Sequence, residues 1–393
     1  MAARGAGAVT TQLASLGRMQ LFSNYVTLLA VLSFASACSE ATAPDDDGRF
    51  APAAAATFRY VGRVDSSVAE ARVLVGAASY VEFGLTGTDS VSVLLEATDF
   101  YVDSTWAVVE VDGRYVGRYA VHSGDTLRLP VTGTSGQADV DTHRVRIFHA
   151  AEPLLAQLIF YGTDGDRPVA FRERPTRRVT FFGDSMSAGA ASDTSAGPCD
   201  RGLSNTNAYL AFPARLGRAL EADYVVHAGS GRGLYTNWNG QDPPLPSLLP
   251  SLYMDTADAR PYRLDDEDPD LALIALGTND INSAPELRAE FDPAVFEATY
   301  REFVDALHAA YPRAALALVG TPMHGGAKND TLNAIIARVA AYAKTAHPDL
   351  RAVAIPLEDR ERHGCPAGPH PSTADHAAIA QEILGGLEGL LDG

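Results

Sequence analysis

Residues 177–185 read RRVTFFGDS, and this stretch decides how the second half of the chain is interpreted. The run from Val179 to Phe182 has the β-branched and aromatic character of a buried strand, and Gly183-Asp184-Ser185 follows it as a tight turn. Downstream, short apolar runs alternate with longer segments of helical periodicity. Such alternation predicts a mainly parallel, doubly wound sheet with helices on both faces.

This α/β domain is expected to span residues 177–393. Further strands are expected at YVVHAGS, DLALIALGTND, AALALVGTP and RAVAIP, and helices over 207–220, 296–312, 331–347 and 373–391. In an open α/β sheet the functional residues lie at the carboxyl ends of the strands. The residues that follow each strand are therefore the candidates for chemistry.

The region upstream, residues 57–170, has a different pattern. Nine short β-type runs, from FRYVGRV to AQLIFYG, are separated by turn residues, which is typical of a β-sandwich or jelly roll. Trp106, in the run TWAVVEVDG, is expected to fill the core of this sandwich. The charged, proline-containing segment 164–178 marks the boundary, so the 393 residues are expected to form two domains.

The N-terminal residues 1–38 have the pattern of an export signal. An apolar stretch at 21–37 follows Arg18 and ends in small residues before Cys38, which resembles a bacterial lipobox with Cys38 as the lipidated residue. Ordinary cleavage after Ala37 and an uncleaved anchor helix are the alternatives. Each places the body of the protein outside the cytoplasm, as a cell-surface lipoprotein or as a periplasmic or secreted protein. Residues 39–56, rich in Ala, Pro and Asp, are expected to be a disordered tether.

Two cysteines remain beyond Cys38, namely Cys199 and Cys365. An even number of cysteines in an exported chain predicts that they pair in a disulfide. Two buried free thiols are the alternative.

Charge excludes one class of partner. The chain has 31 Lys and Arg against 49 Asp and Glu, a formal net charge of −18, which is the wrong sign for binding nucleic-acid phosphates. No His, Cys, Asp or Glu cluster has the spacing of metal ligands, so no metal site is expected.

Four strand or helix ends carry residues suited to chemistry. Ser185 places a hydroxyl on a turn near a helix start, and residues 229–233, GSGRG, form a glycine-rich loop with exposed backbone amides. Asn279 in GTND offers a side-chain donor for an oxyanion, and His370, just before the last helix, is a candidate general base. Taken singly, each has a simpler interpretation: a polar turn, a phosphate loop, a helix cap and a surface histidine.

Together, the ordered blocks GDS, glycine-rich loop, GTND and HP resemble those of the SGNH (GDSL) hydrolase superfamily over about residues 177–391. The resemblance implies serine esterase chemistry without a cofactor, in which Ser185 is the nucleophile and His370 the base. It also implies that the backbone amides of Ser185 and Gly231 and the side-chain amide of Asn279 stabilise the oxyanion.

One position departs from the superfamily pattern. Many members carry an Asp three residues before the catalytic His, where this chain has Ala367. Asp375 is near in sequence, but Ser372-x-x-Asp375 has the spacing of a helix capping box, so a structural role is expected for it. A Ser–His dyad is therefore predicted.

With its missing acid and with a β-domain in front of the hydrolase domain, the chain resembles carbohydrate esterase family two. That family joins an N-terminal jelly roll to an SGNH domain. The block SGRGLYTNW at 230–238 is also similar to that family. The resemblance implies removal of O-acetyl groups from polysaccharides such as xylan and mannan. Tyr235 and Trp238 follow the glycine-rich loop and are candidates for sugar contact, although packing of the loop explains them as well.

The sequence thus predicts an exported carbohydrate O-acetylesterase, with an all-β jelly-roll or β-sandwich domain followed by a flavodoxin-like α/β hydrolase domain. Its partner would be an acetylated polysaccharide or oligosaccharide, and membranes would be met only through the lipid anchor. An SGNH esterase, lipase or thioesterase acting on acyl chains and a catalytically decayed glycan-binding lipoprotein are the alternatives. The oligomeric state is left open.

Overall fold

The computed structural model describes residues 50–87, 90–98, 104–122, 125–130, 142–164, 168–197, 199, 203–240, 243–258, 260–282, 290–365 and 370–391. The predicted export signal, Cys38 and the first part of the predicted tether lie outside these residues. Within the described part of the chain, no helix is both long and apolar enough to cross a membrane.

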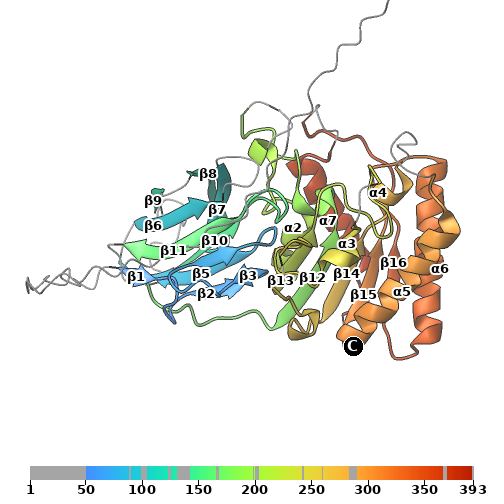
Figure 1. Ribbon diagram of the computed structural model, residues 1–393, viewed down its shortest axis with the longest axis horizontal. Helices are drawn as coiled ribbons and strands as arrows, with labels where there is room; N and C mark the ends of the chain where they lie inside the picture. The colour runs from blue at the N-terminus through green and yellow to red at the C-terminus, as the bar shows by residue number, and fades with distance from the viewer. Residues whose placement is uncertain are drawn as a thin grey trace, which may run out of the picture. The chain divides into compact units, whose positions relative to one another are not determined.

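The N-terminal region forms two antiparallel sheets (Figure 1). One has the order β3 (Val64–Asp65), β4 (Arg72–Leu74), β11 (Leu158–Asp164), β6 (Ser90–Ala97) and β9 (Thr126–Pro130), with β1 (Ala51–Pro52) also paired to β11. The other has the order β2 (Arg59–Val61), β5 (Tyr80–Leu85), β10 (His143–His149), β7 (Ser104–Val111) and β8 (Arg114–His122). A strand-rich β-domain is therefore present where the sequence predicts it.

Alternating side chains from both sheets fill the core between them. In β6 every second residue is buried, and Val91 and Val93 are fully enclosed together with Val109 of β7. Because side chains alternate across a strand, Trp106 and Val108 of β7 point away from the core between the sheets. They pack in a cluster that contains side chains of the hydrolase domain. The predicted place of Trp106 in the sandwich core is therefore wrong.

The start of the fold also differs from the prediction. Ala51 and Pro52 pair with β11, and Ala53 is fully buried, so the tether predicted for 39–56 is too long at its C-terminal end. A two-residue strand that includes a proline has no periodicity from which it could have been recognised.

The second half of the chain forms a parallel sheet, in the order β13 (Ala222–Ala228), β12 (Arg177–Gly183), β14 (Leu271–Ala275), β15 (Ala315–Val319) and β16 (Ala352–Ile355). In chain order this is 2-1-3-4-5, the order of flavodoxin-like folds. The prediction of a parallel α/β domain is confirmed.

Helices cover both faces of this sheet. On one face α2 (Phe212–Ala219) and α7 (Thr373–Gly386) pack on Val179 and Phe181, and on the other α5 (Pro293–Ala310) and α6 (Ala327–Ala346) pack on Phe182 and Ile274. Three short helices, α1 (Ser185–Ala188), α3 (Leu245–Leu248) and α4 (Thr278–Ile281), lie in loops. In Figure 1, α5 and α6 run side by side in orange.

Helix α2 begins later than the sequence predicts. Its expected start was residue 207, but Pro213 occupies the first turn, where a proline favours helix initiation. Asn207 instead donates to Asp193 and accepts from Leu210 N–H, which stabilises a turn before the helix.

The β-domain and the hydrolase domain share a core. Tyr80, Val108 and Phe148 of the β-domain pack in one cluster with Tyr209 and Tyr224 of the hydrolase domain. The antiparallel sheets and the parallel sheet therefore lie on either side of the boundary predicted from composition, but apolar packing continues across it.

Candidate active site

Ser185 lies where β12 ends and α1 begins. Asp184 caps the short helix by accepting from Met186 N–H at 3.0 Å, with its own backbone extended. Gly183 is required by space, because a Cβ there would lie 1.8 Å from Ser187 Oγ. The GDS triplet thus builds a tight strand-to-helix turn that presents the serine.

His370 lies beside this serine. Its Nε2 is 2.8 Å from Ser185 Oγ, across 185 positions in the sequence. Ser185 is 9% exposed and His370 is half-buried, so the pair is set in the protein yet accessible. A hydroxyl within hydrogen-bond reach of an imidazole is the geometry of an activated nucleophile.

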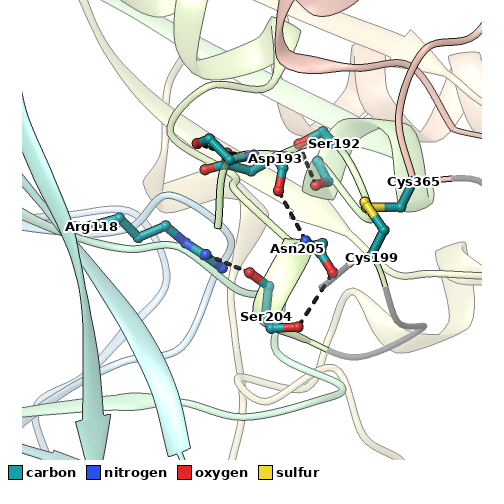
Figure 2. The surroundings of a disulfide bond; sticks show 9 residues. Arg118, Ser192, Asp193, Cys199, Ser204, Asn205 and Cys365 are labelled. Atoms are coloured by element: carbon teal, nitrogen blue, oxygen red, sulfur yellow. Dashed lines mark hydrogen bonds between the residues drawn. A yellow bond between two sulfur atoms is a disulfide. The ribbon is translucent and has the colours of Figure 1, made fainter. Parts of the chain in front are cut away.

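The segment before His370 is tied to the loop that follows Ser185. Cys365 N–H donates to Ala191 O at 2.9 Å, and Gly364 N–H donates to His370 O at 3.0 Å. Cys365 is bonded to Cys199 in the disulfide that the sequence predicts, as Figure 2 shows. These contacts hold the histidine segment against the serine loop.

Asp375 has the structural role predicted for it. Ser372 and Asp375 form the capping box of α7, and the carboxylate also accepts from the His363 backbone N–H at 2.9 Å. Burial opposes ionisation of Asp375, but the hydrogen bonds from His363 and Ser372 outweigh it and lower its pKa to about 2. Ala367, where the superfamily has its acid, falls in residues 366–369, outside the described residues.

The glycine loop, residues 229–233, follows β13. Arg232 N–H donates to Gly229 O at 3.1 Å, and Gly231 has a φ of +75°, which together make a turn that requires glycine at its third position. Among the described residues, none accepts a hydrogen bond from Gly231 N–H. This donor is therefore available to a ligand.

Asp280 of the GTND block holds the chain beyond the glycine loop. Its carboxylate accepts from the backbone amides of Leu234, Tyr235 and Thr236, at 2.9–3.1 Å. Burial raises its pKa to about 6, against the effect of these bonds. Asp280 thus organises the loop.

Asn279 precedes Asp280 in α4. Its side-chain Nδ2 donates to Arg232 O at 2.8 Å and lies 3.3 Å from Asp184 Oδ2. These contacts fix the amide between the glycine loop and the serine turn. Burial raises the pKa of Asp184 to about 7.

The two aromatic candidates differ. Trp238 is 44% exposed, and its indole Cδ1 lies only 2.5 Å from where a Cβ on Gly231 would be, so its ring lies against the loop glycine. Tyr235 instead packs against Phe291 and Phe296, and its hydroxyl accepts from Asp292 N–H. These contacts fit the packing alternative for Tyr235, and a sugar contact at this residue stays a prediction.

Sequence reasoning missed one residue near the site. Glu152, in the connection between β10 and β11, is fully buried and accepts from Ser230 N–H in the glycine loop at 2.6 Å. It belongs to the β-domain, and a single glutamate after an apolar strand carries no signal of such a contact.

For metals, the described residues hold no group of three or more His, Cys, Asp or Glu suited to an ion.

The chain is similar to several known proteins. The family model of the GDSL-like Lipase/Acylhydrolase family matches residues 181–378. An acetylxylan esterase / glucomannan deacetylase of Cellvibrio japonicus (strain Ueda107) is 29% identical over 259 residues, which are 64% of this chain and 68% of that protein.

Two solved structures share the fold of both domains. A family two carbohydrate esterase from Clostridium thermocellum, in complex with cellohexaose, has a TM-score of 0.72 and 24% identity, covering 85% of this chain and 99% of that one. A family two carbohydrate esterase from Cellvibrio japonicus has a TM-score of 0.72 and 22% identity, covering 87% and 98%. Since the family model matches half of the 393 residues, the chain belongs to the GDSL-like Lipase/Acylhydrolase family of serine esterases.

Proposed function

We propose that the chain is a carbohydrate O-acetylesterase in which Ser185 is the nucleophile and His370 the general base. The observation that carries the proposal is the 2.8 Å contact between His370 Nε2 and Ser185 Oγ. A nucleophile and base within this distance suit acyl transfer through a covalent intermediate.

In the first half of the reaction, Ser185 Oγ attacks the acetyl carbonyl carbon while His370 Nε2 takes the hydroxyl proton. A C–O bond forms, and the carbonyl oxygen becomes an oxyanion. When this intermediate collapses, the bond to the sugar oxygen breaks and the imidazolium returns its proton to that oxygen. The free sugar hydroxyl leaves and an acetyl-serine remains.

In the second half, water replaces the sugar. His370 takes a proton from water as the oxygen attacks the acetyl-serine carbonyl carbon, and then returns it to Ser185 Oγ as acetate leaves. The enzyme is restored, and the net reaction consumes one ester bond and one water.

Three donors are proposed to stabilise the oxyanion: the backbone N–H groups of Ser185 and Gly231, and Nδ2 of Asn279. The lack of a described acceptor for Gly231 N–H supports this assignment. Asn279 would exchange its long 3.3 Å contact with Asp184 for the oxyanion. One such donor contributes about 2.7–4 kcal/mol to transition-state stabilisation in other hydrolases.

The substrate class rests on the relatives and on Trp238. The Cellvibrio japonicus relative is an acetylxylan esterase / glucomannan deacetylase, and the Clostridium thermocellum structure is a complex with cellohexaose. The exposed indole of Trp238 beside Gly231 supports a stacking surface for a sugar ring next to the reacting acetyl group.

The test is acetate release from acetylated xylan and acetylated glucomannan by the purified protein, with Ser185→Ala as the matched variant. We expect release that disappears in the variant while its thermal unfolding is unchanged. Release by Ser185→Ala would rule out the serine mechanism. Faster cleavage of p-nitrophenyl octanoate than of the acetate would assign the enzyme to acyl chains, and binding of glycan without hydrolysis would identify a decayed enzyme.

The β-domain is proposed to be a jelly roll. Strand orders β4-β11-β6-β9 in one sheet and β5-β10-β7-β8 in the other support this. Among these eight strands, successive strands change sheet except at the β7–β8 hairpin. Export, with lipidation at Cys38, is also proposed. It is supported by the apolar stretch at 21–37 and by the Cys199–Cys365 disulfide, which persists in an oxidising compartment.

A further inference from the structure

The connection between β10 and β11, residues 150–157, enters the hydrolase domain. Ala150 O accepts from Ala208 N–H at 3.0 Å, just before α2. Leu154 packs against the cluster beneath α5 and α6, and its Cδ1 lies 3.0 Å from where a Cβ on Gly229 would be. A segment of the β-domain therefore lies directly against the glycine loop.

Glu152 is the polar residue of this contact. It is fully buried, and its Oε2 accepts from Ser230 N–H at 2.6 Å, while Oε1 has no hydrogen-bond partner among the described residues. Burial raises its pKa. A buried carboxyl with one unsatisfied oxygen is costly to the fold, so a role in function explains its presence better than stability does.

The contact fixes the peptide immediately before the proposed oxyanion donor. Ser230 N–H belongs to the peptide that precedes Ser230, and Gly231 N–H belongs to the next peptide along. Asp280 holds the chain on the other side, through Leu234 and the two residues after it. Two buried carboxyls, one from each domain, thus clamp the loop on both sides of Gly231.

We propose that Glu152 is a positioning residue: it holds the glycine loop so that Gly231 N–H points at the oxyanion, and it makes the β-domain part of the catalytic apparatus. This inference rests on the proposed function. Donors that stabilise an oxyanion must be fixed before reaction, and a misplacement of about 1 Å can cost roughly 100-fold in rate.

The test compares Glu152→Ala, Glu152→Gln and Glu152→Asp in the full chain, with an acetyl ester as substrate. We expect Glu152→Ala to lower kcat by about 10–100-fold with KM little changed, since the loop acts on the transition state. Glu152→Gln retains an acceptor of the same length and is expected to stay near the wild-type kcat. Glu152→Asp is one methylene too short to reach Ser230 and is expected to behave like Glu152→Ala.

A second readout separates positioning from general weakening of the fold. Methylboronic acid forms a tetrahedral adduct with a serine hydroxyl, so its inhibition constant should rise in Glu152→Ala by the factor by which kcat/KM falls. Val93→Ala is the matched control, because Val93 is buried in the sandwich core among β-domain side chains only. It should lower the melting temperature and leave kcat and the inhibition constant unchanged.

Three results would overturn the inference: wild-type kcat in Glu152→Ala, an equal loss of kcat in Val93→Ala, or a loss in Glu152→Gln as large as in Glu152→Ala. If Glu152→Ala does not fold, the contrast between Glu152→Gln and Glu152→Asp decides. Ser185→Ala in the same assay keeps the two proposals apart, since activity in that variant would remove the proposed function itself.

Discussion

Asn279 shows how single side chains prepare this site before a substrate arrives. Its amide is held by the Arg232 carbonyl, so only the longer contact with the Asp184 carboxyl has to be exchanged when charge develops nearby. The residue types at Ser185, Asn279 and His370 could be predicted from the sequence because their blocks are local. Glu152 could not, because its contact with Ser230 joins two domains and has no sequence pattern.

Replacing Asn279 by Ala should lower kcat by about 10²–10³-fold, with a smaller effect on KM, because one oxyanion donor is lost. Steady-state kinetics on an acetyl ester measure this. Asn333→Ala is the control, because that half-buried amide contacts the Leu357 carbonyl from α6. An unchanged kcat in Asn279→Ala would remove Asn279 from the proposed oxyanion site.

Asp184 should make stability depend on pH in a defined direction. Its pKa, which burial raises to about 7, lies well above the value of about 3.9 in an unfolded chain, so the folded protein binds this proton more tightly. Its contribution to stability is full below about pH 4 and is lost as the pH rises through 7.

Urea unfolding measures the free energy of unfolding of the wild type and of Asp184→Asn. The stability of the wild type relative to Asp184→Asn should therefore fall between pH 5 and pH 8. Asp330→Asn, an exposed change on α6, is the matched control. Parallel pH curves for wild type and Asp184→Asn would contradict the prediction.

At the scale of elements, the segment that carries His370 is held by a disulfide and by backbone hydrogen bonds. Its disulfide spans 166 positions, and Figure 2 shows how Cys365 is joined to Cys199 near Asp193 and Asn205. The pairing was predictable by counting cysteines. The start of α2 and the short strand β1 were not, because a proline at a helix start and a two-residue pairing depend on tertiary context.

Removing the disulfide by Cys199→Ser with Cys365→Ser should lower the unfolding free energy by about 2–5 kcal/mol. The kcat should fall as well, because Cys365 anchors the chain five residues before the proposed base. Thermal unfolding and kinetics, with the wild type under oxidising and reducing conditions as controls, measure both effects. Two titratable thiols in the native wild type would refute the disulfide itself.

Across the whole molecule, a buried polar network joins the two domains. Arg63, fully buried after β2, donates from Nε to His227 Nδ1 at 2.8 Å, and His227 Nε2 lies 2.8 Å from Glu267 Oε1. Because Arg63 needs an acceptor, His227 is neutral here, in keeping with the lowering of its pKa by burial. The strand-rich region and the parallel α/β domain could be predicted from local strand and helix patterns, but a network across 164 positions has no local signature.

Replacing Arg63 by Met should destabilise the protein by about 1–3 kcal/mol or more, because it leaves the buried His227 Nδ1 and Leu249 carbonyl without their donor. Urea unfolding measures this loss, and Arg172→Met, an exposed change in the interdomain segment, is the control. Equal stability of the two variants would contradict the role of the network.

The shared apolar cluster means that the first half of the chain exposes aromatic side chains until the second half has been made and covers them. Tyr80 and Phe148 are synthesised early, yet the side chains that cover them, Tyr209 and Tyr224, follow at least sixty residues later. A fragment ending near residue 170 would therefore expose this aromatic face. It should aggregate, as measured by light scattering, at concentrations where the full chain does not. Exchange of N-terminal domains between relatives would have to preserve this face, so the two halves are expected to be inherited as one unit.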